Sequence, residues 1–450
     1  MRMYGVASTL LTRLFSNNKN KDILATIFLI LWSGIFVFFR YNQIPHALAL
    51  DELEFAKLAL LLDELPFPTV YSTFATGHST VYFYIINMFF KIFGFSNLAL
   101  RLPSALASVF SIILFFLILR KLDWQTKYSL FASLILASSR WFYQFGRFAF
   151  EGTFLIFLEL ITLYFLVSFL KNRNLKNMIL IAIFSGFCFY SYTPGRVFFL
   201  LPILLILFSR NILLKMKLKI IFVFLTIFII LISPLVFQIR QVGDERVQSL
   251  SILSREDINI GQKAMHIWVN GGKLTLMWHV RGDTNARHNY YGKPALNKMA
   301  GGLLLIGLIC FLFGKRNKDD VIWGVWFLVG LLPSLLVTPS DNPHFLRTLP
   351  LVIPTVILIT KGFMSIESTG KKIGEKLKLK KLWLKSGLIT FFCLVILTNA
   401  LWDGRTYFKF QRSTHRDAFR IRIELSDFAD KSLPPTDAMI TEFLEMYGDE

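Results

Sequence analysis

Charged side chains are scarce in this sequence. Of its 450 residues, 17% are charged, 54% are hydrophobic and 16% are aromatic, and phenylalanine alone occurs 47 times. A soluble domain carries about 25% charged residues, so the composition excludes a soluble enzyme and a disordered chain. The mean hydropathy of +0.54 and the long apolar runs indicate an all-α polytopic membrane protein.

Cysteine is also rare, and this excludes a disulfide scaffold. The three cysteines all fall inside apolar runs, at Cys188, Cys310 and Cys393. No two histidines show the helical spacing that is typical of a zinc site. We therefore expect no metal ligands and no required cofactor, with a divalent cation held by carboxylates as the remaining possibility.

The net charge of +20 would indicate nucleic-acid binding in a soluble protein. Here the lysines and arginines cluster between apolar runs, where such residues orient membrane helices. We therefore expect membrane lipids around the chain and no nucleic-acid partner.

The first apolar run covers residues 23–40 and is of spanning length, since a bilayer core needs about 20 helical residues. It ends at Arg40 without the small-residue pattern of a signal-peptidase site. The sequence thus predicts a retained first helix that follows a cytoplasmic N-terminus, residues 1–22.

Ten further apolar runs follow the first. They cover residues 99–119, 128–146, 153–170, 177–194, 196–209, 218–237, 300–314, 321–338, 346–363 and 385–401.

The segment 79–94 decides the topology. It is short and aromatic, and Asn87 and Lys91 interrupt it. If it spans the bilayer, the basic loops around Lys121, Lys176 and Lys217 lie outside. If it lies flat at the interface, these loops lie inside with the basic N-terminus, as the positive-inside rule requires. We therefore predict eleven spanning helices within a membrane domain, residues 23–401.

This topology leaves three polar surfaces on the outer face, namely the loops 41–98 and 238–299 and the tail 402–450. We expect the tail to begin as an amphipathic helix and to continue, after Pro434-Pro435, as the start of a small outer domain. The apolar positions of that predicted helix are Phe419, Ile421, Ile423, Leu425 and Phe428.

Ionisable residues gather on the predicted outer face. Such groups are costly at a membrane boundary unless they are paired or used, so several of them from separate helices indicate one cavity with both acid and base. They are Asp51-Glu52 with Glu54, Glu151, Arg196, His344 and Arg347.

Several motifs carry a resemblance to a known family. They are Asp51-Glu52, the segment Gly77-His78-Ser79-Thr80 with its aromatic continuation to Tyr84, residues 98–105, residues 281–289 with Gly292-Lys293-Pro294, and His344-Phe345-Leu346-Arg347. In this order they resemble the protein O-mannosyltransferase and aminoarabinose-transferase superfamily, over about residues 45–365. Two positions depart from it, since many relatives have Pro-Pro after the Lys or His that His78 matches, and often Asp where Glu151 stands.

The resemblance implies a GT-C fold and an enzyme that takes its sugar from a polyprenyl-phosphate donor. It implies that Asp51 is the catalytic carboxylate, and we expect Glu52 and Glu151 to support it. Donor phosphate needs fixed cationic and hydrogen-bonding groups. For substrate binding the expected residues are His78, Arg101, Arg196, Arg281, His288, His344 and Arg347.

Three alternatives stay open. An oligosaccharide ligase or polymerase with a lipid-pyrophosphate donor would use a similar outer cavity. A transporter would show paired halves and polar residues near the bilayer midplane, whereas these midplanes are almost purely Leu, Ile and Phe. A structural scaffold would not need the acid–base cluster. We expect the acceptor to be a hydroxyl of a protein, lipid or glycan.

Cysteine accessibility in intact cells checks the predicted topology. Cysteines introduced beside Lys171 and Lys372 should react only after lysis, whereas cysteines beside Asp51 and Asp283 should react with an impermeant reagent in intact cells. Labelling near Asp283 only after lysis would reverse the whole arrangement.

Overall fold

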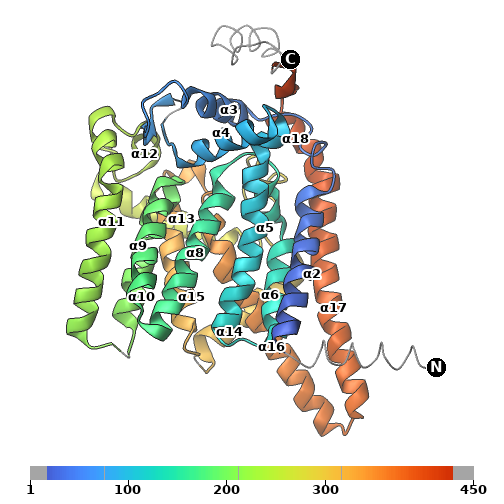
Figure 1. Cartoon of the computed structure of the whole chain (residues 1–450). Helices are drawn as coiled ribbons and strands as arrows, with labels where there is room; N and C mark the ends of the chain where they lie inside the picture. The colour runs from blue at the N-terminus through green and yellow to red at the C-terminus, as the bar shows by residue number, and fades with distance from the viewer. Residues whose placement is uncertain (1–17, 75–76, 211, 316, 429–450) are drawn as a thin grey trace.

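The structure is a computed structural model, and it describes residues 18–74, 77–210, 212–315 and 317–428. Long helices form a bundle, and α3 and α4 lie across one end of it (Figure 1). In the first half of the chain the elements are α2 Asn18–Phe38, α3 Leu50–Leu61, β1 Tyr71–Ser72, β2 His78–Ser79, α4 Val81–Phe93, α5 Asn97–Lys121, α6 Thr126–Ser138, α7 Arg140–Tyr143, the 3-10 turn η2 Gln144–Gly146, α8 Glu151–Asn172 and α9 Leu175–Tyr190.

The second half of the chain completes the bundle. Its elements are η3 Thr193–Val197, α10 Leu200–Phe208, α11 Leu214–Val242, α12 Glu245–Leu250, α13 Ile260–Leu276, α14 Lys298–Phe313, α15 Asp320–Leu335, η4 Pro339–Asp341, η5 Leu349–Leu351, α16 Val352–Lys376, α17 Lys381–Arg405, the π-helical turn η6 Thr406–Gln411, α18 Arg412–Ala418 and η7 Leu425–Phe428.

The predicted fold class is confirmed. Each of the eleven predicted runs contains a helix. Among the described residues, six helices are long and apolar enough to cross a membrane by themselves, and five apolar helices are shorter. The segment 79–94 forms α4, which lies across the end of the bundle with α3 and not among the upright helices (Figure 1).

Close backbone contact joins two of the bundle helices. A Cβ atom at Gly307 of α14 would lie 1.8 Å from the carbonyl oxygen of Leu358, and one at Gly362 of α16 would lie 2.0 Å from that of Leu303. Small residues allow such approach between membrane helices, where packing replaces the hydrophobic effect. The glycines therefore fix how α14 and α16 pack.

One buried arginine caps the C-terminal end of α2. Arg147 has no exposed surface. Its guanidinium donates to the carbonyl oxygens of Phe36, Val37 and Ile44 at 2.6–3.2 Å. The last carbonyls of a helix have no partner within it, so Arg147 satisfies them and ties α2 to the α7–α8 connection.

The predicted run 128–146 is not a single helix. The structure ends α6 at Ser138, and Ser139 is extended before the short α7 and η2. The break turns Arg140 toward the large outer loop, where its guanidinium donates to Asn289 and to the carbonyl oxygen of Pro294. A buried arginine needs such partners. The helix therefore breaks at Ser139, although the apolar run continues beyond it.

Two other runs have different boundaries. The run 196–209 begins as a 3-10 turn, so α10 contains only nine residues. The run 346–363 also starts with a 3-10 turn at Pro350, and α16 then continues to Lys376, well beyond the predicted end.

The predicted amphipathic helix in the tail is wrong. Residues 419–424 contain no helix. Ile421 exchanges backbone hydrogen bonds with Leu48, and the Asn97 side chain donates to the carbonyl oxygen of Ile423. The apolar residues alternate, which is the period of an extended strand. The tail therefore passes as a strap over the first outer loop, and Pro434-Pro435 lies outside the described residues.

Candidate active site

A buried ion pair forms the frame of the site. The Glu52 carboxylate accepts from Nε of Arg101 at 2.7 Å and from its Nη2 at 2.9 Å. It also accepts from the backbone N–H groups of Ala49 and Ala149 at 3.0 and 2.9 Å. Glu52 has no exposed surface. It therefore joins α3 to α5 and to the turn before α8.

Two other carboxylates lie on α3, one residue before Glu52 and two residues after it. Asp51 forms an ion pair with Arg287 of the large loop, and the Arg287 guanidinium lies 5.8 Å from the centre of the Phe150 ring. Glu54 lies one turn further along α3. Burial, and next the negative charge of Asp51, raises the pKa of the Glu54 carboxyl. Asp51, which is paired with an arginine, and Glu54, whose pKa is raised, thus lie close together on α3.

His78 connects the next pair of charges. Its Nδ1 lies 3.3 Å from Oε1 of Glu151 and also 3.3 Å from Nη1 of Arg246. A protonated Nδ1 can donate to Glu151, whereas an unprotonated Nδ1 can accept from Arg246. The proton can satisfy only one of these contacts at a time. Oε2 of Glu151 is buried without a hydrogen-bond partner.

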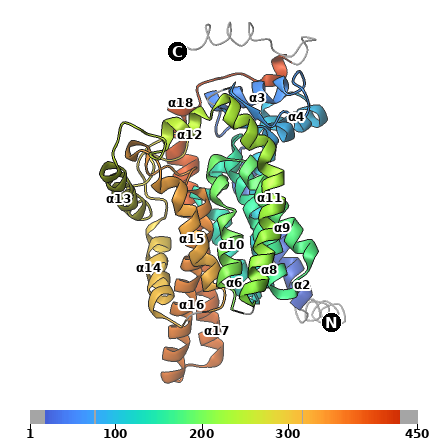
Figure 2. The same ribbon diagram turned by 90° about the vertical axis from the view of Figure 1, so that its left-hand side faces the viewer.

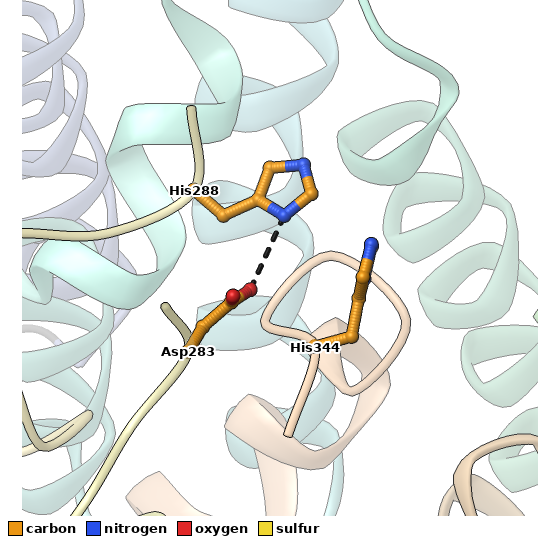
Figure 3. A group of neighbouring side chains, drawn as sticks. All are labelled: Asp283, His288 and His344. Atoms are coloured by element: carbon orange, nitrogen blue, oxygen red, sulfur yellow. Dashed lines mark hydrogen bonds and ion pairs between the residues drawn. The ribbon is translucent and has the colours of Figure 1, made fainter. Parts of the chain in front are cut away.

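Asp283, His288 and His344 form a third group, which Figure 3 shows. The His288 ring lies 3.2 Å, Nδ1 to Oδ2, from Asp283, and its centre lies 4.5 Å from that of His344. Asp283 also accepts from the backbone N–H groups of Asn285 and Phe345, each at 2.7 Å. Burial raises the pKa of Asp283 and lowers that of His288 well below its usual value.

The ligand atoms of this group lie within 4.8 Å of one another, so their spacing alone is compatible with a metal ion. Their hydrogen bonds favour another use. Nε2 of His288 accepts from Nε of Arg287 at 3.3 Å, so Nδ1 carries the proton and donates to Asp283. Nδ1 of His344 accepts from the backbone N–H of Arg347 at 3.2 Å. His344 therefore presents an Nε2–H donor, which suits an anion better than a metal.

An arginine pocket lies beside these groups. This cavity of about 220 Å³ has Arg196, Arg246 and Arg347 in its walls. Arg196 pairs with Asp244 and Arg347 with Asp341. Nε of Arg196 and Nη1 of Arg347 are nevertheless buried without a partner. Apolar side chains complete the walls, namely those of Pro194, Val197, Val247, Leu250, Pro333, Leu336 and Val337.

The structure brings most of the predicted site residues to one end of the bundle. Two of them do not take part as expected. Arg101 is not available for substrate binding, because its side chain is 5% exposed and all three of its nitrogens donate to Glu52 and to the carbonyl oxygens of Pro45 and Ala47. Arg281 is exposed and does not line the arginine pocket.

Sequence reasoning missed two arginines of the site. Arg287 stands within the motif 281–289, beside His288, and its position there is a usable signal. Arg246 lies in the short helix α12 and follows Asp244 and Glu245, and nothing in the sequence around it distinguishes it from a solvated charge.

The comparisons with known proteins agree with this architecture. Residues 77–237 match the profile of the family described as dolichyl-phosphate-mannose-protein mannosyltransferase. The structure of ArnT from Cupriavidus metallidurans bound to undecaprenyl phosphate superposes with a TM-score of 0.55 at 13% identity, over 94% of this chain and 84% of ArnT. The chain has the GT-C fold. The resemblance that the sequence motifs indicated is thereby confirmed.

A second solved structure shows the same fold at larger size. The oligosaccharyltransferase of Archaeoglobus fulgidus, in its apo form, superposes with a TM-score of 0.54 at 12% identity. The match covers 88% of this chain but only 56% of the oligosaccharyltransferase. No curated protein sequence matches the chain.

The Glu52–Arg101 pair generates a prediction about stability. Replacement Arg101→Met leaves a buried carboxylate unpaired, which should lower the free energy of unfolding by about 3–5 kcal/mol. Thermal unfolding in detergent measures it. The control is Lys171→Met, because the exposed Lys171–Asp123 pair should contribute at most about 1 kcal/mol. Equal losses in the two variants would contradict the framing role.

Proposed function

We propose that this protein is a membrane glycosyltransferase that moves a sugar from a polyprenyl-phosphate carrier to an acceptor hydroxyl on the extracytoplasmic face. The observation that carries the proposal is the arginine pocket beside the carboxylates of α3. A phosphate-binding group and a proton acceptor are the two functions that such a transfer requires. The family match and the GT-C fold support the same class of enzyme.

The pocket supports a lipid phosphate as the donor group. Arg196, Arg246 and Arg347 in its walls supply hydrogen-bond donors. His344, three residues before Arg347, offers a further Nε2–H donor. Two of the arginines keep buried N–H groups without a partner, and a phosphate oxygen would satisfy them with strong, charge-assisted bonds. The apolar walls suit the adjoining prenyl carbons. ArnT, which has the same fold, was crystallised with undecaprenyl phosphate.

Asp51 is the proposed general base. The acceptor oxygen attacks the anomeric carbon, the bond from this carbon to the phosphate oxygen breaks, and the bonding electron pair leaves with the phosphate. The acceptor proton passes to Asp51. Attack opposite the leaving group inverts the anomeric configuration. Because Asp51 pairs with Arg287, an arriving phosphate can compete for Arg287 and release the carboxylate.

The sidedness of the proposal rests on charge. The site and the basic α16–α17 hairpin lie at opposite ends of the bundle (Figure 1). Lysine-rich loops stay on the cytoplasmic side, so the site faces outward, where a flipped lipid-borne donor would be available.

We further propose that the transfer needs no resident metal. Both histidines next to Asp283 are oriented by hydrogen bonds with Arg287 and Arg347, and metal binding would require these contacts to break. A divalent cation at Asp51, Glu54 and Glu151 is the alternative that chelation would reveal.

Incubation of the purified protein with radiolabelled polyprenyl-phosphate sugars and membranes tests the function. Transfer of label to protein, lipid or glycan supports the proposal and identifies sugar and acceptor. Transfer from a pyrophosphate-linked oligosaccharide alone would instead identify a ligase. Lipid movement without any covalent transfer would identify a transporter.

The arginine pocket generates a prediction about donor binding. Ala replacement of Arg196, Arg246 and Arg347 together should raise the KM for the lipid donor by at least about 100-fold, because each charge-assisted bond contributes roughly 1.5–3 kcal/mol. Lys replacements keep the charge but lose the bidentate geometry and should be partly active. Arg281→Ala is the matched control, and a loss there equal to the triple variant would contradict the assignment.

Replacement Asp51→Asn keeps the shape of the side chain and removes its basicity. Turnover should fall by about two to four orders of magnitude, while donor affinity changes little because the base acts on the acceptor. Steady-state kinetics separate the two effects. Near-normal turnover in Asp51→Asn, together with an inactive Glu54→Gln or Glu151→Gln, would transfer the role to that carboxylate.

A further inference from the structure

The hairpin formed by α16 and α17 extends past the other helices, at the end of the bundle opposite the candidate site (Figures 1 and 2). Aromatic rings and one ion pair connect it to the neighbouring helix α6. Phe363 of α16 stacks on Phe131 of α6, with ring centres 4.1 Å apart, and on Phe391 of α17 at 5.2 Å. Below this stack Glu367 pairs with Lys127 and Lys371. We call residues 371–386 the hairpin tip.

The hairpin tip combines strong positive charge with exposed apolar side chains. It contains seven lysines and a single glutamate, Glu375. Leu377 is 65% exposed, Leu382 76% and Trp383 71%. The tip has little core of its own, since Gly374 packs against Leu384. A short two-helix hairpin with so little buried surface is marginal in water, so another surface must cover it.

Helix lengths place the hairpin base at the surface of the bilayer. Phe36 of α2 contacts Gly404 of α17, and Phe39 contacts Phe408, so the two helices run side by side in the same direction. Gly387 precedes Gly404 by 17 residues, and Lys19 precedes Phe36 by the same number. Gly387 of α17 therefore lies at about the level of Lys19 of α2. That is four residues, or about 6 Å, beyond Ile23, where the apolar run begins. The lipid head groups occupy about this depth.

Each helix of the hairpin has a glycine near this depth, Gly370 in α16 and Gly387 in α17. Gly370 lies beside Leu388, and Gly387 is only one residue away from that leucine. Each glycine follows a hydroxyl residue, Thr369 or Ser386. Glycine–serine pairs are common points of helix bending. The base can therefore act as a hinge that tilts the tip toward the head groups.

We propose that the hairpin tip binds anionic lipid head groups on the face opposite the candidate site. Four to eight basic residues directly beside a spanning helix are typical of such binding, and exposed Leu and Trp among lysines suit the bilayer interface. A second copy of this chain would bring two clusters of lysines together, so it is disfavoured. The proposal does not depend on the transferase activity.

The test uses the full-length protein with Cys310 and Cys393 replaced by serine. Cys188 is buried, so a fluorophore sensitive to polarity can be attached to a single cysteine introduced by Leu379→Cys. Nanodiscs contain phosphatidylcholine alone or phosphatidylcholine with phosphatidylglycerol. The emission should shift to shorter wavelength, and lipids brominated near the head group should quench it, only when phosphatidylglycerol is present. Asn172→Cys, on another loop at the same end, is the control and should show no dependence on lipid charge.

Charge and hinge are tested separately. Gln replacement of Lys372, Lys376, Lys380 and Lys381 should weaken the preference for the bilayer-bound position by about two orders of magnitude or more, since each lysine near an anionic surface gives roughly a fivefold preference. Arg replacements should keep it. The double variant Gly370→Ala with Gly387→Ala stiffens the base. Both added methyl groups fit, with nothing closer than 3.9 Å, and the shift should decrease without loss of thermal stability.

Several results would overturn the proposal. One is a shift of equal size in pure phosphatidylcholine, and another is an unchanged shift in the Gln variant. A fluorophore that stays exposed in every nanodisc but becomes shielded in native membranes would show that a protein, and not lipid, covers the tip.

Discussion

The candidate site depends on one buried ion pair, Glu52 with Arg101. Four hydrogen bonds converge on the Glu52 carboxylate, two from Arg101 and two from backbone N–H groups. Breaking such a pair from one side is costly, because it leaves a buried charge without a partner. The two candidate site residues Asp51 and Glu151 stand one residue from Glu52 and two residues from Ala149. The Glu52–Arg101 pair therefore fixes the backbone that positions the carboxylates of Asp51 and Glu151.

Around this frame the charges alternate in sign. Asp51 pairs with Arg287, which donates to His288, which in turn donates to Asp283. A separate contact links Glu151 to His78. A network of this kind holds its donors in place before a substrate arrives, and electrostatic preorganisation of this type is a large part of enzymatic rate enhancement. Nε of Arg196 and Nη1 of Arg347 are buried without a hydrogen-bond partner, so donors remain available in the neighbouring arginine pocket.

The sequence predicted the helices of the bundle because apolar runs and lysine clusters are local signals. The position of α4 across the end of the bundle followed from them. The broken helix after Ser138 could not be predicted in this way, since its cause is the contact of Arg140 with Asn289, 149 residues further along the chain. The strap at Ile421 has a similar cause, because its pairing partner is Leu48. Arg101 illustrates the same limit. The sequence around an arginine at a membrane boundary does not distinguish one that binds substrate from one that pairs with a buried glutamate.

The strap has a consequence for the order in which the protein is made. Leu48, just before the helix that carries Asp51, exchanges backbone hydrogen bonds with Ile421, and Asn97 contacts Ile423 and Glu424. During synthesis the segment around Leu48 is therefore uncovered until Ile421 has left the ribosome. All the preceding helices must be inserted before the loop acquires this last contact. Segments that lie more than 370 residues apart in the sequence thus meet beside the candidate site, which becomes complete only after the strap has been synthesised.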